Sequence, residues 1–236
     1  MGGEAMIEII DCAQNSEEWL RARMGLPTSS MFATVIAKGR GDAASKTRAT
    51  YLRKLAGEIV TGEPMENFSN QHIERGHAME GEARDFYAFI TDEEPKIVGF
   101  IRNGPKGGSP DSLIGADGLL EIKTALPHIL IGYIEADKFP AEHVAQCQGN
   151  LWVSEREWLD LTVYWPKMPA FIKRVYRDEA YIASLSDAVD QFNAELAEIV
   201  QRVRWYGDGD KRPHNIRAAA ERYCPGLGEA IVTTGA

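Results

Sequence analysis

The chain has little cysteine, no long apolar run and no excess of positive charge. Its three cysteines, Cys12, Cys147 and Cys224, are far apart and form no Cys-x-x-Cys pair, which argues against structural zinc, an iron–sulfur cluster and a disulfide framework. No stretch approaches the roughly 20 apolar residues of a membrane helix, and the N-terminus lacks the basic and apolar regions of a signal peptide. We therefore expect a cytoplasmic protein with no membrane partner.

The net charge of −9 argues at face value against a nucleic-acid partner, because DNA binding depends on Lys and Arg side chains that displace counterions. The charge is unevenly distributed, however, because the segment from Arg21 to Arg53 carries Lys or Arg at seven positions against the single acid Asp42. An acidic exterior with a local basic wall can still guide a polyanion to one place. The charge is therefore compatible with nucleic acid but does not predict it.

The length of 236 residues, with 44% hydrophobic and 26% charged residues, is typical of one globular domain. We expect this domain over residues 6–206, a partly disordered tail over 207–236, and a short leader over 1–5 that is not part of the fold. Hydrophobic periodicity and Gly/Pro breaks predict helices at 16–24, 27–37, 47–60, 71–90, 142–153 and 185–203, and strands at 96–102, 111–115, 118–124, 159–164 and 171–176. The order of these helices and strands along the chain predicts an α/β (α+β) fold with a central mixed sheet flanked by helices.

The apolar stripe of the last predicted helix, over 185–203, favours core packing, with an oligomer contact as the alternative.

The segment Ser109-Pro110-Asp111, followed after nine residues by Glu121-Ile122-Lys123, carries the clearest chemical pattern. In a strand, residues two apart share a face, so Glu121 and Lys123 point the same way and Ile122 faces the core. A hairpin turn over 115–118 would bring Asp111 beside Glu121, and two carboxylates can bind Mg²⁺. A lysine beside them can stabilise charge on a phosphodiester, so the pattern indicates metal-assisted phosphodiester hydrolysis.

The pattern by itself is loose, because Glu and Lys that alternate on a strand more often mark a solvated face. Two local features favour chemistry. Glu121 and Lys123 lie inside an otherwise apolar run, where buried charges are costly without a partner or a role. Asp111 follows a loop that contains Gly104, Gly107 and Gly108, where backbone can approach a ligand closely.

Further motifs accompany this pattern along the chain, in the order Trp19-Leu-Arg-Ala-Arg23 with Ser29-Ser30, Val35-Ile-Ala-Lys38 with Arg40, Gly76-His-Ala-Met-Glu80 with Ala83-Arg84, Ser109-Pro110-Asp111, Glu121-Ile122-Lys123, and Ala145-Gln-Cys-Gln148 with Trp152-Val153. In residues, order and spacing, the stretch from about Trp19 to Leu196 resembles the lambda exonuclease (YqaJ viral recombinase) family of the PD-(D/E)xK nuclease superfamily. The resemblance implies a restriction-endonuclease-like core.

The resemblance also implies a catalytic site. Asp111, Glu121 and the backbone carbonyl of Ile122 would bind the metal, and Glu80 would complete the shell through water. Lys123 would assist the nucleophile and the developing charge. The cofactor would be Mg²⁺, with Mn²⁺ as the alternative.

One glutamine would join this site. Gln146 and Gln148 lie two apart on a predicted helix and do not share a face, so at most one points inward. The resemblance selects Gln146, which would contact a phosphate or position the attacking water; a purely structural polar residue is the alternative. The five histidines show no metal-ligand spacing, and we expect structural or surface roles for them.

Recognition of a DNA end is implied as well. Arg23 and Ser30 match residues that hold a terminal 5′-phosphate, which suits a guanidinium fork and a hydroxyl near free backbone N–H groups. Ser109 would contribute to the same pocket. Arg40 corresponds to an arginine that follows the minor groove, and Ile73 to an apolar wedge that parts the terminal base pair.

The function implied is a 5′→3′ exonuclease on linear double-stranded DNA that releases 5′-mononucleotides and leaves a 3′ single strand for recombination by single-strand annealing. The resemblance further implies a trimeric ring, a single-strand annealing protein as partner, and phage or prophage origin in a bacterial host cell. The alternatives are a site-specific endonuclease of the same superfamily and a non-catalytic DNA-binding recombination scaffold. The intact set of Asp111, Glu121 and Lys123 argues against a decayed site.

Overall fold

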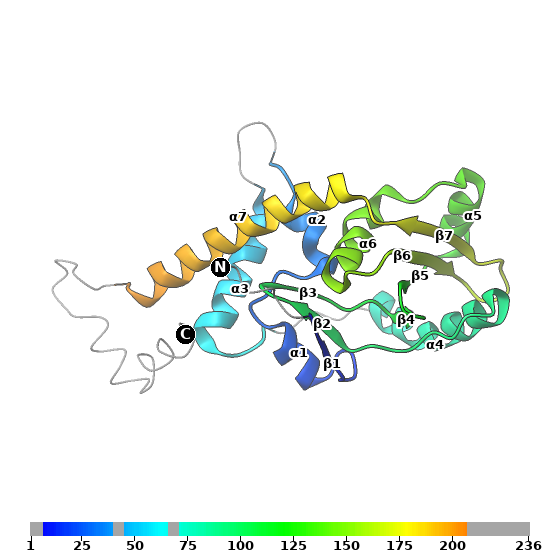
Figure 1. Ribbon diagram of the computed structural model, residues 1–236, viewed down its shortest axis with the longest axis horizontal. Coiled ribbons are helices and arrows are strands. Elements are labelled where there is room, and N and C mark those ends of the chain that lie inside the picture. The colour runs from blue at the N-terminus through cyan, green and yellow to red at the C-terminus, as the bar shows by residue number, and fades with distance from the viewer. Residues whose placement is uncertain (1–6, 40–44, 66–70, 207–236) are drawn as a thin grey trace.

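The computed structural model describes residues 7–39, 45–65 and 71–206, with residues 71–78 described by their backbone only. It contains two sheets (Figure 1). The first is antiparallel, in the order β1 (Ile7–Ile10), β2 (Phe100–Asn103), β3 (Lys106–Gly108). The second has the order β4 (Ser112–Ile114), β5 (Gly118–Thr124), β6 (Trp158–Tyr164), β7 (Phe171–Tyr176). Its β5–β6 pair is parallel and its other pairs are antiparallel, so the predicted mixed sheet is confirmed.

The helices cover both faces of the second sheet. On one face, α4 (Gln71–Thr91) packs through Ala83 and Tyr87 against Leu120 and Ile122. On the other, α5 (Pro127–Ala136) and α6 (Ala141–Ser154) pack against a core that includes Leu119. Because side chains alternate along β5, Glu121 lies on the α6 side and Ile122 on the α4 side. Burial on both faces explains why β5 reads as a nearly continuous apolar run.

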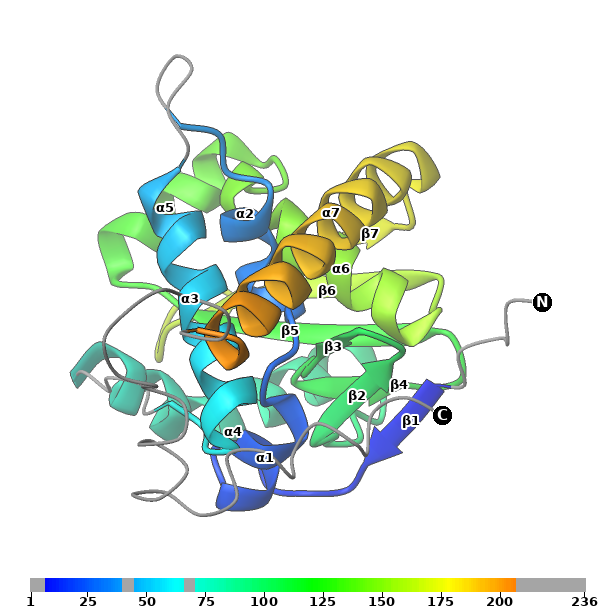
Figure 2. The same ribbon diagram turned by 90° about the vertical axis from the view of Figure 1, so that its left-hand side faces the viewer.

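A second core joins the N-terminal helices to the last helix. It lies between α2 (Phe32–Val35), α3 (Lys46–Thr61) and α7 (Glu179–Arg204), and α3 and α7 lie side by side (Figure 1 and Figure 2). The apolar stripe of α7, which includes Leu185, Val189 and Phe192, is buried there, as the core-packing interpretation predicts. Two short elements precede this core, α1 (Glu17–Arg23) and the 3₁₀ helix η1 (Ser29–Met31).

Several elements differ from the sequence predictions. The helix expected over 27–37 is shorter and starts as η1 before α2, and the strand expected over 96–102 begins only at Phe100. The sequence predictions assign no element to β1, α5 or β3. β3 is Lys-Gly-Gly, a loop-like composition, but Gly107 packs against the Phe100 ring, which any side chain there would overlap. The tail predicted over 207–236 lies outside the described residues.

None of the helices within residues 7–39, 45–65 and 71–206 combines the length and the apolar character that a membrane span needs.

A buried ionic cluster joins α4 to the β6–β7 pair. The Asp160 carboxylate on β6 accepts from both Nε and Nη2 of Arg174 at 2.8 Å, and from the Tyr87 hydroxyl of α4 at 2.7 Å. The Arg174 guanidinium also stacks 3.6 Å from the centroid of Trp158. Burial and the Asp160 carboxylate raise the pKa of Tyr87, so the phenol keeps the proton that it donates. The cluster fixes the sheet against α4.

We expect Arg174→Ala to lower the free energy of unfolding by about 3 kcal/mol, because it leaves the buried Asp160 carboxylate without its cation. This value is at the lower end of the usual range, since the Arg174 side chain is 39% exposed. Urea unfolding measures the loss. The control is Lys173→Ala on the same strand, whose partner Asp137 is exposed and which should cost at most about 1 kcal/mol. Equal losses in the two variants would contradict the assignment.

Candidate active site

The β4–β5 hairpin brings Asp111 to Glu121. Ser112 pairs with Leu120 in the register, and the Asp111 backbone N–H donates to the Leu120 carbonyl at 3.1 Å. The Asp111 side chain turns back and accepts from the Ile122 N–H at 2.5 Å. Arg156 fixes the turn of this hairpin, because its Nη1 donates to the carbonyls of Ile114, Gly115 and Gly118. The hairpin therefore holds the two carboxylates side by side.

Glu121 is 2% exposed and both of its oxygens are hydrogen-bonded. Oε1 accepts from Lys123 Nζ at 2.6 Å and from Gln146 Nε2 at 2.5 Å, and Oε2 accepts from Asn150 Nδ2 at 2.9 Å. Sequence reasoning missed Asn150, although its place four residues after Gln146 on one helix puts it on the same face. Gln148 points elsewhere, to the Tyr176 carbonyl and the Asp178 N–H.

The charges of this cluster are not balanced. Burial, followed by the charge of Glu121, raises the pKa of Asp111 well above its usual range, and Lys123 only partly opposes the shift. Burial alone would lower the pKa of Lys123, but the charges of Glu121 and Asp111 outweigh it and raise that pKa. Lys123 is therefore an ammonium at neutral pH, and it is ion-paired to Glu121.

Glu80, on α4, lies near the acid pair of Asp111 and Glu121, where its charge contributes to the raised pKa of Asp111. It forms an ion pair with Arg84 one turn later. Arg84 in turn donates to the Ser112 hydroxyl at 2.9 Å and lies 3.4 Å from the Asp111 carbonyl. The helix and the hairpin are thus tied together at the point where the acids meet.

The donor set suits a hard divalent cation. In the part of the chain that the structure describes, no three His, Cys, Asp or Glu side chains lie close enough to form a metal cage. Asp111, Glu121 and the carbonyl of Ile122 nevertheless offer oxygen donors, which Mg²⁺ and Mn²⁺ prefer. Mg²⁺ is commonly held by only one or two carboxylates. Since the buried acids exceed the local positive charge, the site fits such an ion.

A second cluster lies around Trp19. The Arg23 guanidinium stacks 4.1 Å from the centroid of the Trp19 ring and donates to the Thr28 hydroxyl at 3.2 Å. Thr28 Oγ1 lies 3.3 Å from Ser30 Oγ, and the Trp19 indole N–H donates to Ser109 Oγ at 2.8 Å. Arg23, Ser30 and Ser109 come from separate segments, and the structure brings them into one cluster. Ser109 is also two residues from Asp111, so the cluster adjoins the acid pair.

Two further predicted site residues are not described at the level of their side chains. Arg40 lies outside the described residues, and of Ile73 only the backbone in α4 is described. Among the histidines, His143 lies beside Lys123, where burial and the lysine charge lower its pKa. Sequence spacing gave no signal for that position, because the contact forms only when α6 packs on β5.

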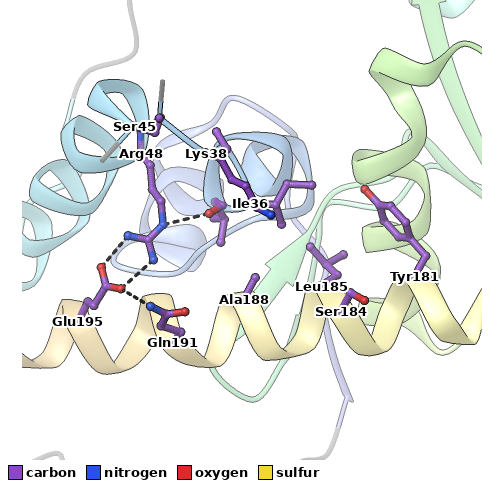
Figure 3. A pocket seen from close by; sticks show the side chains of 13 residues that line it. Ile36, Lys38, Ser45, Arg48, Tyr181, Ser184, Leu185, Ala188, Gln191 and Glu195 are labelled. Atoms are coloured by element: carbon purple, nitrogen blue, oxygen red, sulfur yellow. Dashed lines mark hydrogen bonds and ion pairs between the residues drawn. The ribbon is translucent and has the colours of Figure 1, made fainter. Parts of the chain in front are cut away.

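A groove of about 850 Å³ lies elsewhere, between α7 and the segment that follows α2 (Figure 3). Arg48 closes one side, where its two terminal nitrogens bind Glu195 at 2.6 and 3.0 Å and its Nε donates to the Val35 carbonyl. None of the predicted site residues lines it. The groove offers an ion pair already formed and no group of acids, so the acid cluster is the better candidate for catalysis.

We expect Asp111→Asn to stabilise the protein in EDTA, because the amide removes a buried like charge and keeps an oxygen that accepts from Ile122. A carboxyl pKa raised by folding gives stability at low pH that is lost as pH rises through the raised value. The melting temperature of the wild type should therefore fall relative to that of the variant as the pH rises from the usual carboxyl range through the raised pKa of Asp111. Thermal unfolding measures this, with the exposed Asp117→Asn as control. Parallel pH profiles would contradict the prediction.

Comparisons with known proteins relate the chain to a nuclease family. Residues 18–157 match the family of the YqaJ-like viral recombinase domain. The crystal structure of an alkaline exonuclease, LHK-Exo from Laribacter hongkongensis, is 30% identical with a TM-score of 0.73, and the match covers 88% of this chain and 100% of that chain. LHK-Exo in complex with dAMP matches with the same coverage at 31% identity and a TM-score of 0.73.

A phage-related exonuclease from Haemophilus somnus 129PT is 13% identical, with a TM-score of 0.60 over 75% of this chain and 96% of that chain, and shows the fold alone. No curated protein sequence matches the chain. The structural matches confirm the predicted nuclease fold.

Proposed function

The chain belongs to the YqaJ-like viral recombinase family, whose solved relatives include an alkaline exonuclease, and on this premise we propose a specific activity. The protein is a Mg²⁺-dependent exonuclease that degrades linear double-stranded DNA from 5′ to 3′ and releases 5′-mononucleotides. The remaining 3′ single strand enters homologous recombination by single-strand annealing. The observation that carries the proposal is the position of the Arg23 cluster, which is joined to the acid pair by the stretch from Ser109 to Asp111.

The chemistry is divided among the residues of the acid cluster. Asp111, Glu121 and the Ile122 carbonyl would hold the ion, and Glu80 would complete the oxygen shell. Mg²⁺ or Mn²⁺ supplies Lewis-acid polarisation of the scissile phosphate when bound. Lys123 keeps its proton, so we assign it to the charge that develops on the phosphate oxygens.

Gln146 has a separate task. Its amide N–H holds Glu121, and its side chain is only partly buried, so its carbonyl oxygen can accept from the attacking water. In this arrangement one helix orients both the carboxylate and the nucleophile.

End recognition is assigned to the Arg23 cluster. Stacking on Trp19 and the bond to Thr28 fix the plane of the Arg23 guanidinium, which leaves further N–H groups for a phosphate. The exposed Ser30 hydroxyl and Ser109 would add donors. The dAMP complex of LHK-Exo supports a nucleotide-binding site in a relative of the same fold.

The proposal extends to assembly and partners. Three copies would form a ring around DNA, with Arg40 in the minor groove and Ile73 as the wedge at the terminal base pair. The ring would act with a single-strand annealing protein in the bacterial host of a phage or prophage. These points are supported by family membership. A strictly monomeric mass in light scattering would contradict the ring.

Digestion of linear and circular duplexes tests the activity. We expect Mg²⁺ to support degradation of the linear duplex only, and EDTA to abolish it. Asp111→Ala, Glu121→Ala and Lys123→Ala should each lower cleavage by orders of magnitude with unchanged circular dichroism, because these side chains act on the transition state. Asp117→Ala, in the turn of the same hairpin, is the control and should cleave normally.

Two outcomes of this digest would contradict the proposal. Cleavage of the circular duplex would favour a site-specific endonuclease, and near-normal cleavage by Asp111→Ala would remove the metal-site assignment. DNA binding without any cleavage by the wild type would favour a non-catalytic scaffold.

A comparison of 5′-phosphorylated and 5′-hydroxyl duplexes tests end recognition. A charge-assisted contact contributes about 1.5–3 kcal/mol, so the phosphorylated end should be degraded on the order of 10 to 100 times faster. Arg23→Ala should remove most of this preference by slowing the phosphorylated substrate. Arg23→Lys should restore only part of it, because an ammonium lacks the fork.

The matched control is Arg21→Ala on the same helix, an exposed residue paired with Glu17, which should keep the preference. Equal rates of degradation for phosphorylated and hydroxyl ends in the wild type would refute the assignment of end recognition to the Arg23 cluster. A preference that survives Arg23→Ala would assign recognition to Ser109 and its neighbours instead.

A further inference from the structure

Asn150 is a buried polar residue beside the acid cluster. It is 1% exposed and lies on α6, four residues after Gln146, so helical spacing directs both side chains at β5. Gln146 donates to Oε1 of Glu121, and Asn150 donates to Oε2. One helix thus supplies a separate amide donor to each oxygen of the same carboxylate.

This pair of contacts restricts the direction in which Glu121 can bind a cation. An ionised carboxylate has about four acceptor positions. The bonds from Lys123, Gln146 and Asn150 occupy both positions on Oε1 and one on Oε2. The position that remains is on Oε2, beside Asn150. Without Asn150, Oε2 would keep two open positions and the carboxylate plane would be held from one oxygen only.

The surroundings of Asn150 point to a role beyond packing. Within the described residues its Oδ1 has no hydrogen-bond partner, and a buried acceptor without a partner destabilises the folded state. An apolar side chain of similar size would avoid that cost. The reverse amide orientation would set an oxygen against Glu121, so the donor must face the carboxylate.

Neighbouring backbone leaves space for this amide. A Cβ at Gly108 of β3 would lie 2.7 Å from Asn150 Oδ1 and 2.8 Å from Ser29 Oγ of η1. Glycine at position 108 is therefore required for the approach of β3 to α6, because any side chain there would overlap Asn150.

We propose that Asn150 is a positioning residue of the metal site, which directs the free acceptor position of Glu121 Oε2 toward the cation. The inference rests on the proposed function, since it requires a cation at Asp111 and Glu121. Outer contacts that orient a metal ligand typically change metal affinity by about 10- to 100-fold. The effect should appear in the affinity for the ion more than in the rate at saturating ion.

The experiment titrates the full-length protein with Mn²⁺ alone by isothermal calorimetry, and measures cleavage against metal concentration. Asn150→Ala removes the donor, and Asn150→Leu removes it at nearly constant volume. Both should weaken Mn²⁺ binding by about 10- to 100-fold and raise the half-saturating metal concentration equally, with a smaller fall in the saturated rate. Should Asn150→Leu fail to fold, the test is the split within Asn150→Ala, in which Mn²⁺ affinity should fall much more than the cleavage rate at saturating metal; equal losses in both would overturn the inference.

The matched control is Gln148→Ala, on the same helix and also buried, whose side chain bonds the Tyr176 carbonyl of β7 and the Asp178 N–H before α7, and not Glu121. It should bind Mn²⁺ as the wild type does. Wild-type affinity in both Asn150 variants would overturn the inference, and so would a loss confined to Asn150→Ala, which would indicate packing. A wild type that binds no Mn²⁺ and cleaves in EDTA would instead overturn the proposed function itself.

Discussion

The close approach of two carboxylates, the buried Glu121 and the partly buried Asp111, is the constraint on which the rest of the structure depends. Asp111 and Glu121 repel each other where solvent screens them poorly, which raises the pKa of Asp111. The surrounding elements supply donors from different directions, with Lys123 from the strand, two amides from α6 and the Ile122 N–H from the hairpin. These contacts orient the charges without cancelling them. A fold that only needed stability would place apolar residues here.

Local patterns were the part of this molecule that could be predicted. The period-2 alternation of β5 predicted that Glu121 and Lys123 share a face, and the turn chemistry predicted the hairpin that brings Asp111 to them. The stripe of α7 predicted burial of that helix. Each of these follows from residues close together in the chain, where strand and helix geometry fix the relative positions.

Contacts between distant elements could not be predicted in the same way. Asn150 resembles any polar helix residue until α6 crosses β5, and β3 resembles a loop until Gly107 meets the Phe100 ring. The helix α5 is apolar at nearly every position, so it lacks the alternation of faces that marks a helix in sequence. In these cases tertiary packing, and not local preference, decides the structure.

The short stretch from Ser109 to Asp111 has a further consequence, because it is anchored at every residue. Ser109 accepts from the Trp19 indole, the Pro110 carbonyl accepts from Gln14, and Asp111 is bonded to β5 on both its backbone and its side chain. Proline also fixes the backbone angle at the centre. The separation between the Arg23 cluster and the acids is therefore set by this three-residue stretch and by the hydrogen bonds that anchor it. In the proposed reaction this stretch fixes the distance between the bound 5′-phosphate and the metal site. That distance would determine the length of each released product.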